Sequence, residues 1–523
     1  MTDSDQHWQK SRHIAERIVI QGELELITPA HFGSGDDGVT ADLTLLRDAY
    51  AGVALLPGAS IAGALRSYWR ERMYGYDAPA RDSELFGAHR GQRDEMDGEQ
   101  SLLIVQDAIG DPPQVELRDG VKIDGATRTA AKDHLFDVEL LQAGTRFPLC
   151  FELLITEKPG IGETWPAYEA LPRETRAARL KERRDLLCAD LALAFQGFER
   201  EEIALGARKR RGFGRCRVKE WHVRCYDLTN SKELFMWLAQ GRSGEGWAED
   251  VGEANGATLA EKLGVTLNEA IDQRDRFAME AEFALEGSLL IRSGAGASDV
   301  GPDAVHLHAL YYDREQDRFN LQPIVPGTSL AGVLRARALR IANTLTPDRV
   351  KAQALVNALF GLGPQDDGKN KKENRASKLI VQETVVRNVK PLVQNRIRID
   401  RFTGGAMDNY LFGEAPVFEQ VDSRLKINIV VRKPEKAEIG LLLLLLKDLW
   451  TGDLPIGGES SVGRGRLRGK SATLRRSQPG QPTQWTIEEA KGGLNVQRDG
   501  RADGAEESLQ EFVTALSDEW ARR

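Results

Sequence analysis

Cysteine is scarce in this chain of 523 residues. The four cysteines, Cys150, Cys188, Cys216 and Cys225, form no CxxC pair and have no histidines at a metal-ligand spacing. Structural zinc sites and disulfide frameworks both need such patterns, so we expect neither. The scattered cysteines are typical of a protein from the reducing cytoplasm.

Long apolar runs are also absent. The first residues, MTDSDQHWQKSRH, are polar and predict no signal peptide. The most apolar run, Ile439 to Leu446, is followed at once by Lys447 and Asp448, and it is far shorter than the roughly 20 residues that a membrane span requires. The sequence therefore predicts a buried helix at this run, no membrane partner and a cytoplasmic protein.

The chain also lacks an excess of positive charge, since its formal net charge is -8. This argues against a protein that coats nucleic acid with its whole surface, although binding depends on local charge. The apolar fraction of 41% and the charged fraction of 29% are typical of a globular protein. The length indicates two to four domains.

An internal repeat organises the chain. LLPGASIAGALRS, with Pro57 and Gly58, returns as IVPGTSLAGVLRA, with Pro326 and Gly327. Four more matches follow in the same order: LFG, LIVQ followed by an acid, an alternating segment around Asp124 and Asp400, and a late GFGR or GRGR. Such ordered matches indicate two related copies, each of normal domain size.

The copies and their flanks give five regions. We expect an N-terminal tail at 1–18, a first domain at 19–227, a polar and Gly-rich linker at 228–275 and a second domain at 276–470. The remainder, 471–523, contains QPGQPTQ and is predicted to be a linker with a C-terminal helical extension.

The pattern within a copy predicts an α+β fold class. Arg17 to Ile27 alternates as a strand, Ser60 is expected to cap a helix that runs to about Tyr74, Leu186 to Phe198 is a second amphipathic helix, and Cys216 to His222 is a strand. Together with inserted hairpins, this order predicts two tandem ferredoxin-like domains.

A basic turn lies near the end of each copy. LGARKRRGFGRCRV, from Leu205 to Val218, has six basic residues, three glycines and no acid, and the second copy has GGESSVGRGRLRGK. Glycine lets the backbone approach a ligand, and guanidinium groups suit a phosphate backbone. Neither turn is a Walker loop or a dinucleotide fingerprint. The alternative is a solvated basic turn.

Two further segments, Lys122 to Leu135 and Arg396 to Leu411, run as strand, polar turn and strand. We interpret them as protruding hairpins, with ordinary surface hairpins as the alternative.

The ordered set of a Gly-rich loop, the PG[AT]S helix start, LFG and the late G-[FR]-G-R turn resembles the RAMP superfamily of CRISPR-associated proteins. Within it, the chain is similar to a tandem fusion of two target-RNA-cleaving backbone subunits of type III effectors, of the kind that type III-D-like systems carry. The resemblance implies RRM-like domains with thumb hairpins that stack along a guide RNA. It also implies three kinds of partner: CRISPR guide RNA, complementary target RNA and other type III effector subunits.

The resemblance places the cleaving residue of the first copy at Asp42, because Asp42 is followed by five residues and a turn aspartate, Asp48. A carboxylate there can hold Mg²⁺ or another divalent cation, or orient an attacking 2′-hydroxyl. Asp36 lies in the same loop and is a further candidate. The alternative for Asp42 is an ordinary turn carboxylate.

The second copy departs from this pattern. In the second copy the turn aspartate is Asp313, and the residue six positions before it is Leu307 rather than an aspartate. His306 and His308 flank Leu307, and Asp303 is the nearest carboxylate. Either the loop has slipped and Asp303 cuts, or this copy only binds. The histidines are candidates for a general base or are simply strand residues.

The candidate RNA-binding residues gather in the loop, helix start, hairpin and basic turn of each copy. They are His31, Ser60, Arg66, Lys122, Arg128, Arg208, Lys209, Arg210, Arg211 and Arg215 in the first copy, and Ser329, Arg335, Arg396, Arg398, Arg401, Arg464 and Arg466 in the second. The leading hypothesis is a guide-directed endoribonuclease subunit. Its rivals are a backbone subunit that does not cut and an endonuclease that processes guide RNA.

Overall fold

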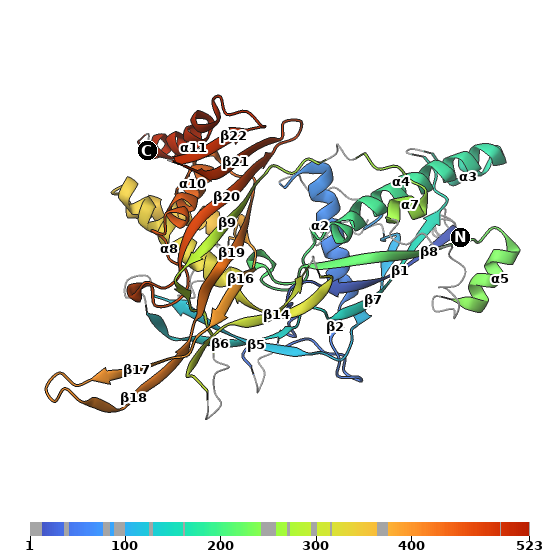
Figure 1. The fold of residues 1–523 in the computed structure, drawn as a ribbon. Helices are drawn as coiled ribbons and strands as arrows, with labels where there is room; N and C mark the ends of the chain where they lie inside the picture. The colour runs from blue at the N-terminus through green and yellow to red at the C-terminus, as the bar shows by residue number, and fades with distance from the viewer. Residues whose placement is uncertain are drawn as a thin grey trace.

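The computed structural model describes residues 13–35, 41–76, 84–87, 100–124, 129–160, 163–241, 258–268, 272–293, 301–313, 316–362, 375–491 and 493–521. These residues form two α+β halves that follow the two copies of the repeat (Figure 1). No helix within these ranges is long and apolar enough to cross a membrane.

The first half is built on an antiparallel sheet with the strand order β3–β7–β1–β8. Helix α2 follows β1, and α4 follows β7, so the chain order is strand, helix, strand, strand, helix, strand, which is ferredoxin-like. Its elements are β1 (Ile14–Leu26), β2 (Leu55–Leu56), α2 (Gly58–Tyr74), β3 (Leu103–Val105), β4 (Ala108–Ile109), β5 (Val115–Ile123), β6 (Ala130–Leu141), β7 (Arg146–Thr156), α3 (Trp165–Glu169), α4 (Arg173–Glu199), the 3₁₀ turn η1 (Lys209–Arg211), β8 (Cys216–Asp227), α5 (Ser231–Gln240) and α7 (Leu259–Leu263).

The start of α2 differs from the prediction. The helix begins at Gly58 with Pro57 as its N-cap, and Ser60 makes no capping hydrogen bond and is exposed. The backbone N–H of Gly58 instead donates to the carboxylate of Asp107 at 2.6 Å. A side chain that is distant in sequence therefore satisfies the helix N-terminus, and a local capping rule cannot anticipate it.

The second half repeats this arrangement within a larger sheet. Strands β15 and β16 both pair with β19, and β19, β9 and β20 lie in the same relative order as β7, β1 and β8. Its elements are β9 (Arg276–Glu286), β10 (Ser288–Leu289), β11 (Arg292–Ser293), β12 (Ala304–His306), β13 (His308–Asp313), β14 (Arg318–Val325), α8 (Gly327–Leu345), α9 (Arg349–Phe360), β15 (Leu379–Val381), β16 (Thr384–Pro391), β17 (Gln394–Ile399), β18 (Ala406–Ala415), β19 (Val417–Arg432), α10 (Lys436–Trp450), η3 (Ser460–Val462), β20 (Arg466–Ser477), β21 (Thr483–Ala490), β22 (Gly493–Arg498) and α11 (Ala505–Ala521). The apolar run at Ile439 lies in the buried helix α10, as predicted.

The region after the second copy is a sheet extension rather than a linker. Strand β20 continues to Ser477, the segment QPGQPTQ forms the turn into β21, and β22 pairs with β21. Trp485 of β21 is buried and stacks edge-on against Phe512 of α11, the predicted C-terminal helix. On these strands single apolar residues alternate with polar ones, so the segment is polar on average. Its average composition therefore predicted a linker where the structure has strands.

Part of the predicted inter-copy linker also belongs to the first core. Leu259 and Leu263 of α7 are buried against the first half, and the side chain of Glu199 accepts a hydrogen bond from the backbone N–H of Leu259 at 2.8 Å. The segment 242–257 of the predicted linker lies outside the described residues.

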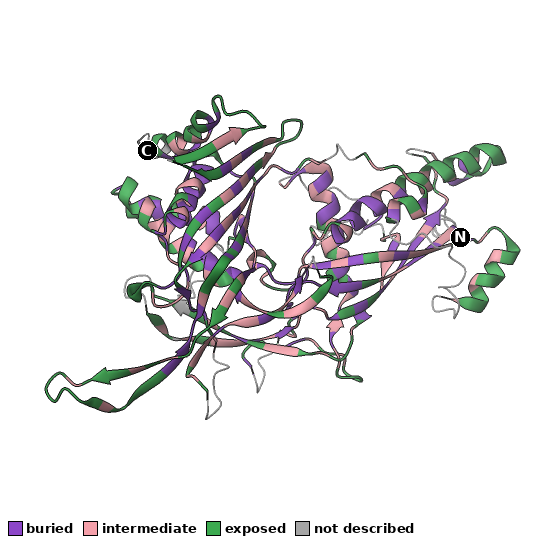
Figure 2. Cartoon of the chain, viewed as in Figure 1, coloured by how far each residue is buried: buried purple, intermediate pink, exposed green. Residues whose placement is uncertain are grey.

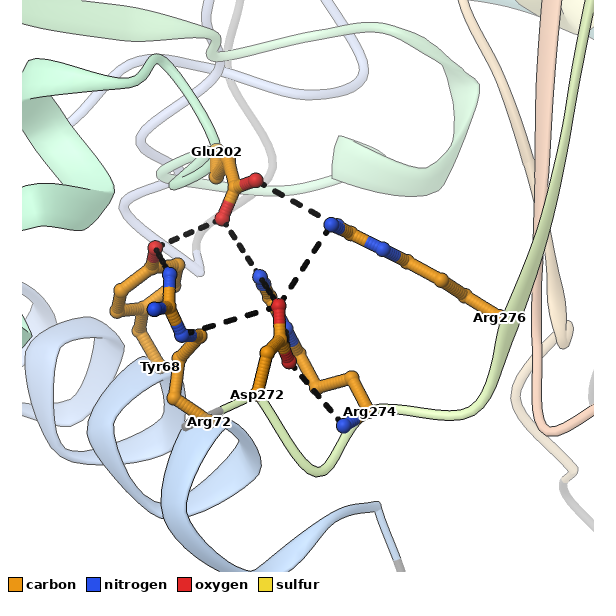
Figure 3. A network of polar contacts seen from close by, with 6 residues as sticks. All are labelled: Tyr68, Arg72, Glu202, Asp272, Arg274 and Arg276. Carbon is orange, nitrogen blue, oxygen red and sulfur yellow. Dashed lines mark hydrogen bonds and ion pairs between the residues drawn. The ribbon is translucent and has the colours of Figure 1, made fainter. Parts of the chain in front are cut away.

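An ionic network around the buried Arg72 and Arg274 joins the chain leading into β9 to the first half (Figure 3). Arg274 pairs with Asp272 at 2.7 Å and with Glu202 at 2.9 Å, and Glu202 accepts a hydrogen bond from the Tyr68 hydroxyl at 2.7 Å. Arg72 of α2, which is 2% exposed, lies within 3.8 Å of Asp272. Burial, together with Glu202, raises the pKa of Tyr68 to about 12, so this hydroxyl stays a donor. The network fixes the orientation in which the second copy begins.

Candidate nucleic-acid interface and cleavage sites

The second-copy hairpin, β17 with β18, projects away from the body of the molecule (Figure 1) and is largely exposed (Figure 2). Phe402 at its tip is fully exposed, and the neighbouring Arg401 is exposed as well. Arg398 lies over the ring of Tyr410, with 5.1 Å from the guanidinium carbon to the ring centroid. Exposed aromatic and guanidinium groups together suit single-stranded RNA, because bases stack on them and phosphates pair with arginine.

The first-copy hairpin, β5 with β6, instead extends along the junction and contacts the second copy (Figure 1). Arg118 of β5 pairs with Glu383, and both side chains are buried. Arg208 lies over the ring of Phe136 at 4.8 Å from its centroid. The side chain of Lys122 and the whole of Arg128 lie outside the described residues, so their predicted roles stay predictions.

Asp42 is held at the base of the first hairpin. Its Oδ2 atom accepts a hydrogen bond from the backbone N–H of Asp137 on β6 at 3.0 Å. The next residue, Leu43, forms a parallel bridge with Val138. Asp42 is exposed, and no described residue is hydrogen-bonded to its other carboxylate oxygen.

Asp303 has the same surroundings at the base of the second hairpin. Its Oδ2 atom accepts a hydrogen bond from the backbone N–H of Gly413 on β18 at 2.7 Å, and the next residue, Ala304, pairs in parallel with Glu414. Asp303 is exposed too. The structure therefore makes Asp303 the positional counterpart of Asp42. The equivalence cannot be found by counting residues to the PG motif, because the second copy has extra residues in the β13–β14 hairpin, which lies between Asp303 and that motif.

The neighbours of the two aspartates differ. In the first copy, Asp119 lies directly opposite Asp137 across β5 and β6, and partial desolvation, Asp119 and Asp42 together raise the pKa of Asp137. At the matching positions the second copy has Asn395 and Gly413. Within the described ranges no three His, Cys, Asp or Glu side chains are arranged to hold a metal ion. Asp36 lies outside the described residues.

His306 is a core residue. It is 1% exposed, its Nδ1 accepts a hydrogen bond from the backbone N–H of Ile291 at 3.2 Å, and its Nε2 lies 3.1 Å from the carbonyl oxygen of Ile324. Burial, with a smaller contribution from His308, lowers the pKa of His306 to about 4. Nδ1 of His308 lies 2.7 Å from the carbonyl oxygen of His306. The geometry favours the strand-residue alternative over a general base at His306.

Several predicted RNA-binding residues brace the fold. Arg66 donates to the carbonyl oxygen of Gly87 at 3.3 Å, and Arg335 donates to that of Gly361 at 2.7 Å, so each arginine ties its helix to the LFG segment of its own copy. His31 is 6% exposed, and its Nδ1 lies 2.8 Å from the carbonyl oxygen of Glu139. By contrast, Ser60 is exposed and Ser329 is half-buried.

The first basic turn lies against the second copy. Arg210 donates to the carbonyl oxygen of Ser377, and Arg211 donates to those of Leu379 and Phe360, both at 3.3 Å. Burial lowers the pKa of both arginines. Lys209 is exposed, and Arg208 is half-buried.

The second basic turn contains a buried ionic cluster. Arg464, which is 3% exposed, pairs with Glu414 and Glu459 at 3.2 Å each, and Arg396 pairs with the same two carboxylates. Arg466, on β20, is exposed. Of the predicted residues in this turn, Arg466 is therefore the one that can meet a ligand directly.

A cleft of about 640 Å³ lies between the halves, over the open face of the second sheet. Its lining includes the predicted Arg215 and a set that the sequence analysis missed, together with the acids Glu280 and Glu282. The missed basic and aromatic residues are Tyr311, Tyr312, Arg387, Arg424, Lys426 and Arg475. For the residues on β19, the sequence contains a signal in the alternation of SRLKINIVVR. Leu425, Ile427 and Ile429 of this segment are buried, and the polar residues between them face the cleft.

The sequence matches the family model of the RAMP superfamily over residues 23–217 and 283–468, more than half of the chain. The chain belongs to the RAMP superfamily. No curated protein matches it. As a RAMP protein of two tandem copies, it is a CRISPR-associated RNA-binding protein, and both matched regions coincide with the ferredoxin-like halves.

Proposed function

We propose that this RAMP protein is a backbone subunit of a type III CRISPR ribonucleoprotein that binds guide RNA and cleaves complementary single-stranded target RNA at two sites. The observation that supports two sites is the matched placement of Asp42 and Asp303. Each is exposed at the base of a hairpin, and each holds the backbone of that hairpin through one oxygen only.

The second carboxylate oxygen of each aspartate is available for chemistry. In the proposed reaction it accepts the proton of a 2′-hydroxyl on the target strand, the 2′-oxygen attacks the adjacent phosphorus, and the 5′-oxygen leaves with a proton from water. The hydrogen bond from Asp137 or Gly413 keeps the carboxylate oriented during this step. The products are a 2′,3′-cyclic phosphate and a 5′-hydroxyl.

The proposal assigns no step to a metal ion. The described residues provide no ready set of three ligands, although the facing pair Asp119 and Asp137 makes the first site the more acidic of the two. Mg²⁺ or another divalent cation stays a proposal for that site. Running the cleavage assay with and without a chelator tests it at each cut separately.

The RNA path proposed here runs from the exposed second hairpin to the cleft over the second sheet. Arg398, Arg401 and Phe402 supply guanidinium and stacking groups at the hairpin. Arg215, Arg424 and other basic side chains line the cleft. These groups contact phosphates and bases without needing a defined sequence, which suits a subunit whose specificity comes from a guide.

The test uses the assembled ribonucleoprotein, a matched guide and an end-labelled target RNA. Asp42→Asn and Asp303→Asn keep an oxygen that can accept the backbone hydrogen bond but remove the base. We expect each variant to slow one cut by about 10²–10⁴-fold and to leave the other cut and target affinity unchanged.

Asp48→Asn is the matched control, because Asp48 caps its own turn through the N–H groups of Tyr50 and Ala51. If both variants make both cuts at the wild-type rate, the aspartates do not catalyse cleavage. Loss of a cut in His308→Ala but not in Asp303→Asn would assign the second site to imidazole instead.

A further inference from the structure

The contact between the two copies uses a turn on one side and a helix start on the other. The carbonyl oxygen of Arg211 lies so close to Gly327, at the start of α8, that a Cβ atom there would be 2.2 Å from it. A Cβ atom on Gly212 would likewise be 2.5 Å from the backbone nitrogen of Glu383. Arg118, Arg210 and Arg211 bond across this contact, and Arg215 donates to the side chain of Gln382 at 3.4 Å.

The first copy has the same receiving surface, which we call the acceptor face and define as Gly58, Phe86, Ser101, Leu103, Gln106 and Asp107. Its internal hydrogen bonds match those of the second copy. The Ser101 hydroxyl donates to the carbonyl oxygens of Leu85 and Leu103, as Ser377 does to those of Leu359 and Leu379.

Within the described residues, the acceptor face of the first copy is more open than that of the second. Asp107 is exposed, whereas its counterpart Glu383 is 3% exposed beneath the docked turn and hairpin. Ser60 is exposed, whereas its counterpart Ser329 is half-buried. The carboxylate and the backbone carbonyls that receive arginine in the second copy are thus present in the first copy.

The second copy does not carry the matching turn. Arg208 and Glu459 have the same left-handed backbone conformation before η1 and η3, and Gly212 and Gly463 have it after them. Ser461 and Val462 therefore stand where the first copy has Arg210 and Arg211. In the hairpins, Gln394 pairs with Glu414 as Arg118 pairs with Val138, so the third arginine is replaced as well.

We propose that the acceptor face binds a different chain that carries a glycine-bounded turn with two adjacent arginines, and that this protein does not dock onto copies of itself. A head-to-tail contact that repeats between identical chains produces a closed ring or an open filament. Docking Ser461 and Val462 onto the acceptor face would cover its carbonyls and Asp107 without donors, which is costly. The inference concerns assembly and holds whether or not the protein cuts RNA.

Sedimentation velocity of the purified full-length chain tests it. The probe is this protein with the arginine turn restored, Ser461→Arg/Val462→Arg, at two exposed positions. We expect wild-type protein to stay monomeric at concentrations at which the variant assembles, and we expect Gln394→Arg to strengthen that assembly further.

Two substitutions of the acceptor face complete the test. Asp107→Arg in the triple variant that also carries Gln394→Arg should weaken assembly by at least about tenfold, because it reverses the charge that meets the restored hairpin arginine. Since Asp107 also holds the N–H of Gly58, Ser60→Trp provides a second block that leaves that bond intact. Asp185→Arg, on the exposed side of α4, is the charge-matched control.

Assembly of wild-type protein that is sensitive to Asp107→Arg would show that a second copy of this chain is the occupant and would overturn the proposal. So would a double variant that stays monomeric while folded, or assembly that neither Asp107→Arg nor Ser60→Trp affects.

Discussion

The bases of the two hairpins are built from equivalent positions with opposite chemistry. One face of the first base is apolar: Val138, Leu140 and Phe213 are buried together, and Arg118 lies over the ring of Phe213. In the second copy, Glu414 stands at the position of Val138, and Arg464 stands at that of Phe213.

The difference in chemistry between the two bases accompanies a difference in where the two hairpins lie. The first hairpin and turn are packed against a neighbouring copy, where apolar packing accompanies the ion pairs of Arg118 with Glu383 and Glu116, and such packing suits a permanent contact. The second hairpin projects with no described neighbour beyond its own base, and there an ionic cluster fixes its direction. One fold thus uses the same elements once for internal docking and once, in the proposed function, for binding RNA.

The largest effect is expected at the docked hairpin. Arg118→Met leaves the side chain of Glu383 buried without a partner, which should lower the free energy of unfolding by about 3–5 kcal/mol. Denaturant unfolding measures this. The counterpart change, Gln394→Ala, removes one hydrogen bond from Arg464 and should cost about 1 kcal/mol. Equal losses in both variants would show that the two bases do not differ in this way.

The second prediction concerns RNA binding by the β17–β18 hairpin, where we expect a smaller effect than the stability loss in Arg118→Met. Each of Arg398→Gln and Arg401→Gln should make the log–log salt dependence of RNA affinity shallower by about 0.7, the value for one contact to a single strand. Fluorescence anisotropy with single-stranded RNA over a salt series measures the slope. Arg210→Gln and Arg211→Gln serve as the comparison, since these side chains face carbonyl oxygens of the second copy. An unchanged slope for Arg398→Gln and Arg401→Gln, with a reduced slope for the turn variants, would reverse the assignment of roles.

The smallest effect concerns pH at the second base. Burial and the hydrogen bond to Glu459 raise the pKa of Glu414 above its usual value of 4.5, despite Arg396 and Arg464. The native state therefore binds a proton that the unfolded chain has lost, and this part of the stability falls as pH rises through the window just above 4.5. Glu459, whose pKa is lowered, contributes in the opposite direction below that window.

Thermal unfolding of wild type and Glu414→Gln across pH 4 to 8 separates these contributions. We expect the stability of wild type relative to Glu414→Gln to decrease as pH rises. Phe213→Leu in the first base is the control and should show no pH-dependent difference from wild type. An increase in relative stability with pH would mean that the arginines dominate and that Glu414 is ionised throughout.

The repeat, the order of strands and helices and both hairpins could be predicted from the sequence, because they depend on local alternation and on motifs that recur. The C-terminal β21–β22 extension could not, since its apolar residues are few and Trp485 finds its aromatic partner, Phe512, on the distant helix α11. The assignment of Asp42 used spacing within one loop. The equivalence of Asp303 depends on pairing with β18, more than a hundred residues away, and so required the fold. The docking of Arg210 and Arg211 was hidden for a similar reason: an arginine that meets a carbonyl oxygen looks the same in sequence as one that meets a phosphate.

The anchored linker has a consequence for the spacing between the two aspartates. Helix α7 is packed into the first core, and the segment just before β9 is held by the network of Arg274, Asp272 and Glu202. Because both ends of the connection are fixed, the effective concentration of the first copy at the second is high, of millimolar order for short tethers. Dilution of the protein therefore does not separate the two copies. The distance between Asp42 and Asp303 is therefore a property of the polypeptide itself and stays constant however scarce the protein becomes.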